Sequence, residues 1–116
     1  MTEEAERAYR KSLLILERRD HTETEMQQKL TRYEFSEESI VIAIERLKEY
    51  GLINDRRFAE QYIRYHYEAY SKRVLAMKLL KKGIRADLFD SVYAEIRETL
   101  EICPEQEALI RAVAMA

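Results

Sequence analysis

Residues 22–35, TETEMQQKLTRYEF, decide the fold, because the same pattern returns 49 residues later as residues 71–84, SKRVLAMKLLKKGI. Each copy opens on a hydroxyl residue and carries apolar residues at matching positions. The agreement extends to both sides of these copies. At the same offset Tyr9 aligns with Phe58, Leu13 with Tyr62, Met26 with Leu75, Leu30 with Leu79, Ile40 with Phe89, Ile44 with Tyr93 and Leu47 with Ile96. A repeat of this length is one supersecondary unit, and stacked units build elongated interaction surfaces rather than catalytic clefts.

Composition predicts that each unit is helical. Of 116 residues only two are Gly and one is Pro, while 36% are charged. Such a chain favours helices over strands and turns. We therefore expect an all-α fold of tandem three-helix repeats in an elongated array with helix-turn-helix-like units. The expected helices span residues 4–19, 22–33, 37–50, 55–69, 72–82, 87–101 and 104–115. They group into a first unit (1–53), a second unit (54–101) and the first helix of a third (102–116), as in a piece of a longer protein.

Local signals set the expected helix ends. Thr22 and Glu25 have the spacing of a capping box, and Ser36 and Ser71 precede the next apolar runs. Gly51 and Gly83 are expected in the left-handed conformation that ends helices, with the following residue packed back onto the helix. On this basis Leu52 and Ile84 should fold back, and the fifth helix should point Val74, Leu75 and Leu79 inward.

Charge is spread unevenly along the chain. Residues 1–53 carry a net charge of −3, residues 54–85 carry +6 and residues 86–116 carry −5, which sum to −2. The middle segment is thus a basic band that could face an acidic partner or phosphates. It could equally be a set of solvated helix faces that neutralise acidic neighbours.

Catalytic chemistry finds little support in the sequence. His21 and His66 have no partner at metal-ligand spacing and are expected at the surface or its boundary. Cys103 is the only cysteine, so it forms no internal disulfide, and this fits a reducing cytoplasm. No glycine-rich phosphate loop, apolar membrane span or secretory signal is present in the sequence. We expect a cytoplasmic, monomeric protein that is not an enzyme, uses no cofactor or metal and does not enter membranes.

Two features remain as candidate binding residues. The first is a tyrosine-rich run in which Tyr65 and Tyr67 cannot share one helical face with Tyr62, so at least one should be exposed for a partner or a nucleic-acid base. The alternative is a tyrosine at the contact between units. The second is a run of basic residues on the fifth helix and its exit with no acidic residue between them. The predicted partner-binding residues are Arg64, Tyr65, Tyr67, Lys72, Arg73, Lys78, Lys81, Lys82 and Arg85.

The ordered motifs resemble one family. Residues 18–26, RRDHTETEM, followed by Lys29 and Leu30, resemble the opening "RR-x-(H/Y)-(S/T)-x-x-E-L-x-x-K-L" of RecX regulatory proteins. Residues 44–62, IERLKEYGLINDRRFAEQY, resemble that family's "L-x-x-x-G-(L/Y)-(I/L)-(N/D)-D-x-x-(F/Y)-A-x-x-(Y/F)", and residues 78–84, KLLKKGI, resemble its "L-x-x-K-G-I". Family members usually have glycines and often a proline near residues 69–73, and a complete third unit, which this chain lacks.

The resemblance implies a non-enzymatic modulator of the RecA recombinase. Such proteins bind the recombinase filament on single-stranded DNA, lodge along its groove, and inhibit its ATP hydrolysis, strand exchange and co-protease activity. The resemblance also implies weak or indirect contact with single-stranded DNA. Two other hypotheses stay open: an autonomous helical nucleic-acid-binding module, with the fifth helix against phosphates, and a purely structural scaffold. The acidic ends of the chain weigh against strong autonomous DNA binding.

Overall fold

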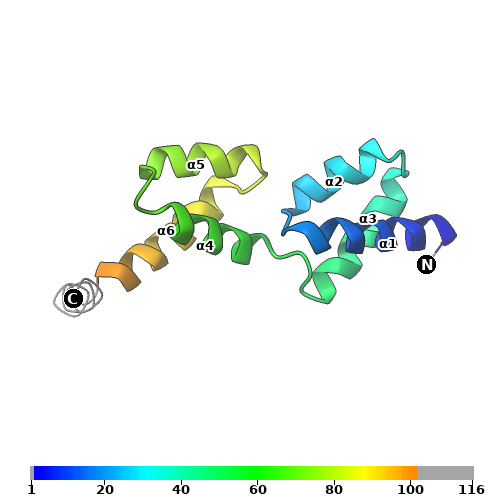
Figure 1. The fold of residues 1–116 in the computed structure, drawn as a ribbon, viewed down its shortest axis with the longest axis horizontal. Helices are drawn as coiled ribbons and strands as arrows, with labels where there is room; N and C mark the ends of the chain where they lie inside the picture. The colour runs from blue at the N-terminus through cyan, green and yellow to red at the C-terminus, as the bar shows by residue number, and fades with distance from the viewer. Residues whose placement is uncertain (1, 102–116) are drawn as a thin grey trace.

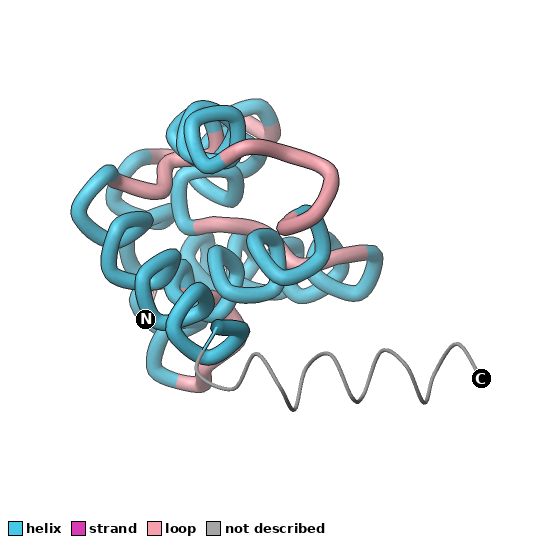
Figure 2. Tube along the Cα trace, turned by 90° about the vertical axis from the view of Figure 1, so that its left-hand side faces the viewer, coloured by secondary structure: helices cyan, strands magenta, loops and turns pink. Residues whose placement is uncertain are grey.

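The computed structural model describes residues 2–101 as six helices arranged in two units, with no strand in that range (Figures 1 and 2). The first unit holds α1 (Glu3–Arg18), α2 (Glu23–Arg32) and α3 (Glu37–Glu49). The second holds α4 (Asp55–His66), α5 (Lys72–Lys81) and α6 (Ala86–Glu101). All-α character and tandem three-helix units are therefore confirmed. The expected helix at 104–115 and the third unit at 102–116 lie outside the described residues.

Each unit has its own apolar core. α1 packs mainly against α3, and α4 packs in the same way against α6, while α2 and α5 cover these pairs. Four of the seven equivalent pairs named from the repeat are buried in both units, and the other three include side chains that are only partly buried. The four buried pairs are Met26 and Leu75, Leu30 and Leu79, Ile40 and Phe89, and Leu47 and Ile96. The repeat in the sequence is thus a repeat of core positions, and the molecule measures 56 × 27 × 21 Å because two small cores lie end to end.

Capping chemistry accounts for where the helices begin. The Thr22 hydroxyl accepts from the Glu25 N–H while the Glu25 carboxylate accepts from the Thr22 N–H, which completes the predicted capping box. The side chains of Ser36 and Ser71 cap α3 and α5. Asn54 caps α4. These contacts are local in sequence, so the helix starts agree with expectation to within one residue.

Helices α2, α3 and α5 end in the same way. At each end a residue with positive φ is followed by an N–H that bonds back to a carbonyl five residues earlier: Phe35 to Leu30, Leu52 to Leu47 and Ile84 to Leu79. Gly51 (φ 69°) and Gly83 (φ 91°) occupy two of these positions as predicted, but Glu34 (φ 65°) occupies the third. A side chain in this conformation is strained, so α2 ends at a sterically costly residue.

Two expectations about this region were wrong. Leu52 was expected to fold back after Gly51, yet it is exposed and Ile53 is buried in its place. The N–H groups of Leu52 and Ile53 both point to the Leu47 carbonyl. In this geometry the side chain of Ile53, rather than that of Leu52, enters the core. The fourth helix was expected to run to residue 69 but ends at His66, after which the Tyr70 N–H bonds to the His66 carbonyl and the chain turns into α5.

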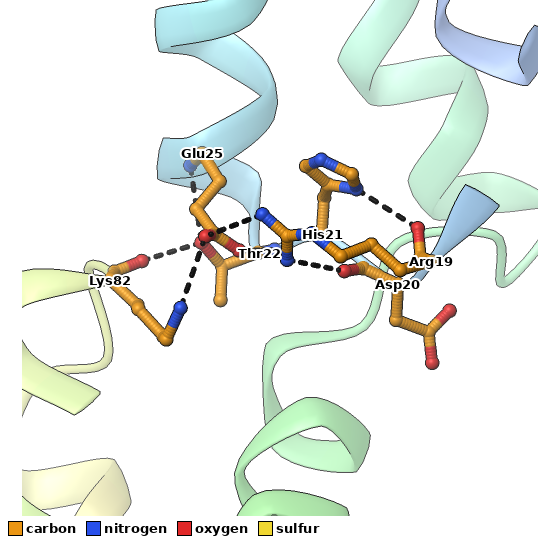
Figure 3. A network of polar contacts seen from close by, with 6 residues as sticks. All are labelled: Arg19, Asp20, His21, Thr22, Glu25 and Lys82. Carbon is orange, nitrogen blue, oxygen red and sulfur yellow. Dashed lines mark hydrogen bonds and ion pairs between the residues drawn. The ribbon is translucent and has the colours of Figure 1, made fainter. Parts of the chain in front are cut away.

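The two units meet at a polar contact that we call the seam. The Thr22 hydroxyl donates to the Lys82 carbonyl at 2.5 Å, and the Lys82 ammonium lies 3.3 Å from the Glu25 carboxylate (Figure 3). A second bond runs from the Glu23 N–H to the Asp55 carboxylate at 2.9 Å. The start of α2 thus lies against the end of α5. The Thr22 side chain caps α2 and also donates to a carbonyl at the C-terminal end of α5.

Candidate partner-binding surface

The largest group of predicted site residues that the structure brings together lies on the side of α5 that faces away from the second core. Leu75 and Leu79 are fully buried and fix which side of the helix points inward. The opposite side, which we call the α5 outer face, is exposed along the whole helix. It consists of Arg73, Val74, Met77, Lys78, Leu80 and Lys81.

The α5 outer face is both basic and apolar. Met77 and Leu80 are 54% and 63% exposed, and Val74, which was expected inside, is exposed as well. Val74 fails as a core residue because Leu75 and Leu79, one turn apart, already fill the narrow contact with α4 and α6. Exposed apolar side chains between cations form a surface that can bury area and pair charge at once.

The cations of α5 differ in what they contact. Lys78 lies 4.9 Å from the Tyr70 ring centroid and Lys72 lies 5.3 Å from that of Tyr93, so both rest on aromatic rings. Arg73 and Lys81 are exposed and have no ion pair among the described residues. These two side chains are therefore the cations most available to a partner.

Three other predicted site residues already have contacts within the molecule. Lys82 is held at the seam by Glu25, and its ammonium also lies 5.9 Å from the Phe58 ring centroid. Arg85 is exposed and lies 3.7 Å from the Asp87 carboxylate. Tyr67 is half-buried against the second core, with its ring 5.9 Å from that of Tyr93.

The tyrosine-rich end of α4 presents one open ring. Tyr65 is 84% exposed, as expected for at least one tyrosine of the run, and Arg64 beside it is exposed too. His66 lies between Tyr62, Tyr65 and Tyr70, with centroid distances of 4.5, 4.8 and 5.0 Å. Burial raises the pKa of Tyr62, and Tyr70 adds to this effect. These ring contacts pack the end of α4 against Tyr70 and leave Arg64 and Tyr65 on its surface.

Electrostatics at the seam favour an ionised Glu25. Burial opposes ionisation of this carboxyl, but the Thr22 N–H, Arg19 and Lys82 outweigh it and hold its pKa below the usual value. Glu25 therefore serves as cap for α2, anchor for Lys82 and partner of Arg19.

His21 is buried beside the seam, so the expectation that it lies at the surface or its boundary was wrong. Its Nδ1 lies 2.9 Å from the Arg19 carbonyl, which accepts a hydrogen bond and so places the proton on Nδ1 (Figure 3). Burial lowers the pKa of His21, and the positive charges of Arg19 and Lys29 act in the same direction. The imidazole is therefore a neutral structural group.

Two kinds of feature are absent from residues 2–101, a group of metal-ligating side chains and a membrane-spanning helix. Among residues 2–101 no three His, Cys, Asp or Glu side chains are grouped so that they could hold a metal ion. No helix in this range is both long and apolar enough to span a bilayer.

Comparison with known proteins matches both units. The family description "RecX, first three-helix domain" fits residues 8–47, and "RecX, second three-helix domain" fits residues 54–92. "Regulatory protein RecX" of Clostridium perfringens strain SM101 is 38% identical over 77 residues, which are 66% of this chain and 36% of that protein. The protein of the same name from Mycobacterium sp. strain JLS is 36% identical over 93 residues, which are 78% of this chain and 51% of that one.

The fold is shared with solved structures. The crystal structure of RecX from Lactobacillus salivarius aligns with 99% of this chain and 71% of its own, with a TM-score of 0.75 and 23% identity. The chain spans about a third to a half of the length of the two curated relatives named above. Two different three-helix domains of one family, found in tandem and each coinciding with one unit of the fold, show that this chain belongs to the RecX family.

Proposed function

We propose that this chain is a non-enzymatic regulator that binds the RecA recombinase filament on single-stranded DNA and inhibits its ATPase, strand-exchange and co-protease activities. The observation that carries the proposal is the tandem match to both RecX domains, whose relatives are named regulatory proteins. An elongated pair of units suits a partner that is itself an extended filament, because contacts can be spread along it.

The α5 outer face supplies the contact in this proposal. Arg73 and Lys81 meet acidic groups or phosphates of the filament, while Met77 and Leu80 bury apolar area beside them. Arg64 and Tyr65 at the end of α4 add a second exposed basic and aromatic element. Lys72, Lys78 and Arg85 extend the positive potential, and Lys82 orients the surface through the seam.

The test compares two double charge reversals in an assay of DNA-dependent ATP hydrolysis by RecA. Arg73→Glu with Lys81→Glu should weaken inhibition and lower its sensitivity to salt, because fewer ions are released on binding. Arg7→Glu with Arg10→Glu changes the net charge equally on exposed α1 positions and should leave inhibition close to that of the unmodified chain. Inhibition that survives the α5 reversals unchanged would show that this face is only a solvated surface.

An autonomous nucleic-acid-binding module is the second candidate, and it is favoured by the same basic helix. It predicts that the chain binds naked single-stranded DNA as tightly as it binds the RecA–DNA filament at matched salt. The proposed function predicts clearly tighter binding to the filament. A pull-down with both baits, in the same buffer, separates these hypotheses.

A further inference from the structure

A groove of about 580 Å³ lies between α1 and α2 in the first unit, on elements that the proposed function does not use. Lys11, Leu14 and Arg18 line it from α1, and Lys29 lines it from α2. Tyr33, at the end of α2, closes one side. A volume of this size is typical of a small-ligand site.

Charge in the groove is strongly one-sided. Four cations line it, Lys11, Arg18, Arg19 and Lys29, against a single carboxylate, that of Glu17. Arg19 is engaged by Glu25, but neither Arg18 nor Lys29 has an ion pair among the described residues. Uncompensated cations around a concave surface concentrate anions there, so the groove suits an anionic ligand.

An aromatic ring stands among these cations. Tyr33 is 51% exposed, and the Lys11 ammonium lies 4.3 Å from its ring centroid. Leu14 on the facing helix is exposed as well. A basic groove with an accessible aromatic side chain is the arrangement on which single-stranded nucleic acids are bound, with phosphates on the cations and a base stacked on the ring.

The walls of the groove argue against a peptide ligand. Both walls are helices whose main-chain groups are bonded within the helix, so an extended peptide would find no backbone partners. A peptide helix requires a mainly apolar groove, whereas four of the nine residues that line this groove are cationic. A nucleotide needs neither, since its phosphate and its base both bind to side chains.

His21 belongs to the groove lining as a buried side chain. It is only 4% exposed, and its Nε2, which has no hydrogen-bond partner among residues 2–101, is itself enclosed. A ligand in the groove therefore contacts the cations and Tyr33, while His21 keeps the structural role described above.

We propose that the α1–α2 groove binds a nucleotide unit, with its phosphate on Arg18 and Lys29 and its base against Tyr33. Free nucleotides and single-stranded nucleic acid share this chemistry, and the experiment below separates them. The inference goes beyond the proposed function and does not rest on it, because the groove and the α5 outer face lie on different units.

The experiment measures binding of a short labelled oligothymidine by fluorescence anisotropy over a salt series, with no recombinase present. Arg18→Glu with Lys29→Glu should lower the steepness of log K against log salt by about 0.7, because the one phosphate that these two side chains hold is no longer neutralised. Tyr33→Ala should weaken binding roughly fivefold to a hundredfold by removing one stacked base. Lys29→Gln, a milder change, should reduce affinity in the same direction.

Matched control variants test whether the oligothymidine binds in the groove. Arg7→Glu with Arg10→Glu places the same reversed charges on α1 outside the groove lining. Tyr50→Ala removes another exposed tyrosine that, like Tyr33, is the C-cap of its helix. Both should leave oligothymidine binding nearly unchanged, and circular dichroism should show unchanged helix content in every variant.

Competition identifies the source of the nucleotide. Displacement of the labelled strand by thymidine monophosphate would support a free-nucleotide site, and failure to displace it would support a strand site. Equal or better competition by an oligoglutamate peptide would overturn the proposal. So would absence of oligothymidine binding, groove variants that bind like the unmodified chain, or binding that disappears only on Arg73→Glu with Lys81→Glu.

Discussion

Gly83 and Gly51 take similar backbone conformations, but substitution of each by Ala should have different costs. Both have positive φ, so an alanine at either site meets the strain of the left-handed region, about 1–2 kcal/mol. At Gly51 an added methyl group would enter open space. At Gly83 it would overlap the side chain of Thr24, in the first turn of α2 in the other unit. The difference between the two variants therefore measures how closely the two units approach at the seam.

The extra cost can be worked out along two routes. If the seam holds, the overlap must be absorbed by shifts of α2 and α5, and overpacking of this kind costs about 1–3 kcal/mol. If the seam opens instead, the Thr22–Lys82 hydrogen bond breaks at a cost of about 0.5–1.5 kcal/mol, and the half-buried Lys82–Glu25 pair adds up to about 1 kcal/mol. The first route predicts that Gly83→Ala loses about 1–3 kcal/mol more than Gly51→Ala, and the second route predicts an extra loss of about 0.5–2.5 kcal/mol.

Urea denaturation of both variants, followed by circular dichroism, tests this difference. Small-angle scattering then separates the routes, because an opened seam lengthens the molecule and a strained one does not. Thr24→Gly in the Gly83→Ala background removes the three atoms that lie nearest to the new methyl group and should recover part of the loss. Equal losses at Gly83 and Gly51, with unchanged scattering, would refute the close approach of Gly83 to Thr24.

Three further predictions concern stability. Glu34→Gly should stabilise the chain by up to about 1 kcal/mol in the same denaturation assay, because glycine relieves the positive φ at the end of α2; a loss of stability would show that the Glu34 side chain contributes more than its strain. Leu47→Ala and Ile96→Ala should each cost about 2–5 kcal/mol, since both side chains are fully buried at equivalent positions; a loss under about 1 kcal/mol at either would remove that site from the core. The free energy of unfolding should fall in two steps as pH drops, below about 6.5 because the folded-state pKa of His21 is depressed, and below about 4.5 because that of Glu25 is depressed too. His21→Asn should abolish the first step, and a first step that persists in this variant would belong to another group.

The sequence predicted those parts of the fold that depend on near neighbours. Thr22 and Glu25 cap α2 through contacts three residues apart, and the positive φ of Gly51 and Gly83 follows from glycine chemistry. Such features need no knowledge of the distant chain. The burial of Leu30 and Leu79 was predictable too, because a helical period and an internal repeat both pointed to it.

What the sequence could not predict depends on how the units meet. The Thr22 hydroxyl donates to a carbonyl 60 residues away, and no local pattern contains that bond. Lys82 was grouped with the free cations of α5, although the seam gives it a carboxylate partner. Val74 was counted as core because six apolar residues on a ten-residue helix cannot all be assigned to a face until the neighbouring helices are known.

The α1–α2 groove escaped sequence analysis for an electrostatic reason. Charge was summed over segments, and residues 1–53 sum to −3. That sum hides the separation that folding produces, because many of the carboxylates of this unit lie in the first turns of α1, α2 and α3. Lys11 and Arg18 on α1 and Lys29 on α2 share one groove. A count by helix face, rather than by segment, would have indicated the site.

The seam should matter for binding although it is built from contacts inside the molecule. A filament presents its subunits at fixed spacing, so two units held at a fixed angle lose less freedom on binding than two units on a loose tether. Gly83→Ala is suited to test this, because it changes no charge and lies outside both the α5 outer face and the α1–α2 groove. We expect it to weaken inhibition of RecA ATPase several-fold while Gly51→Ala, with similar backbone strain, does not. If scattering shows a lengthened Gly83→Ala molecule that still inhibits fully, the units bind the filament independently and the seam serves stability alone.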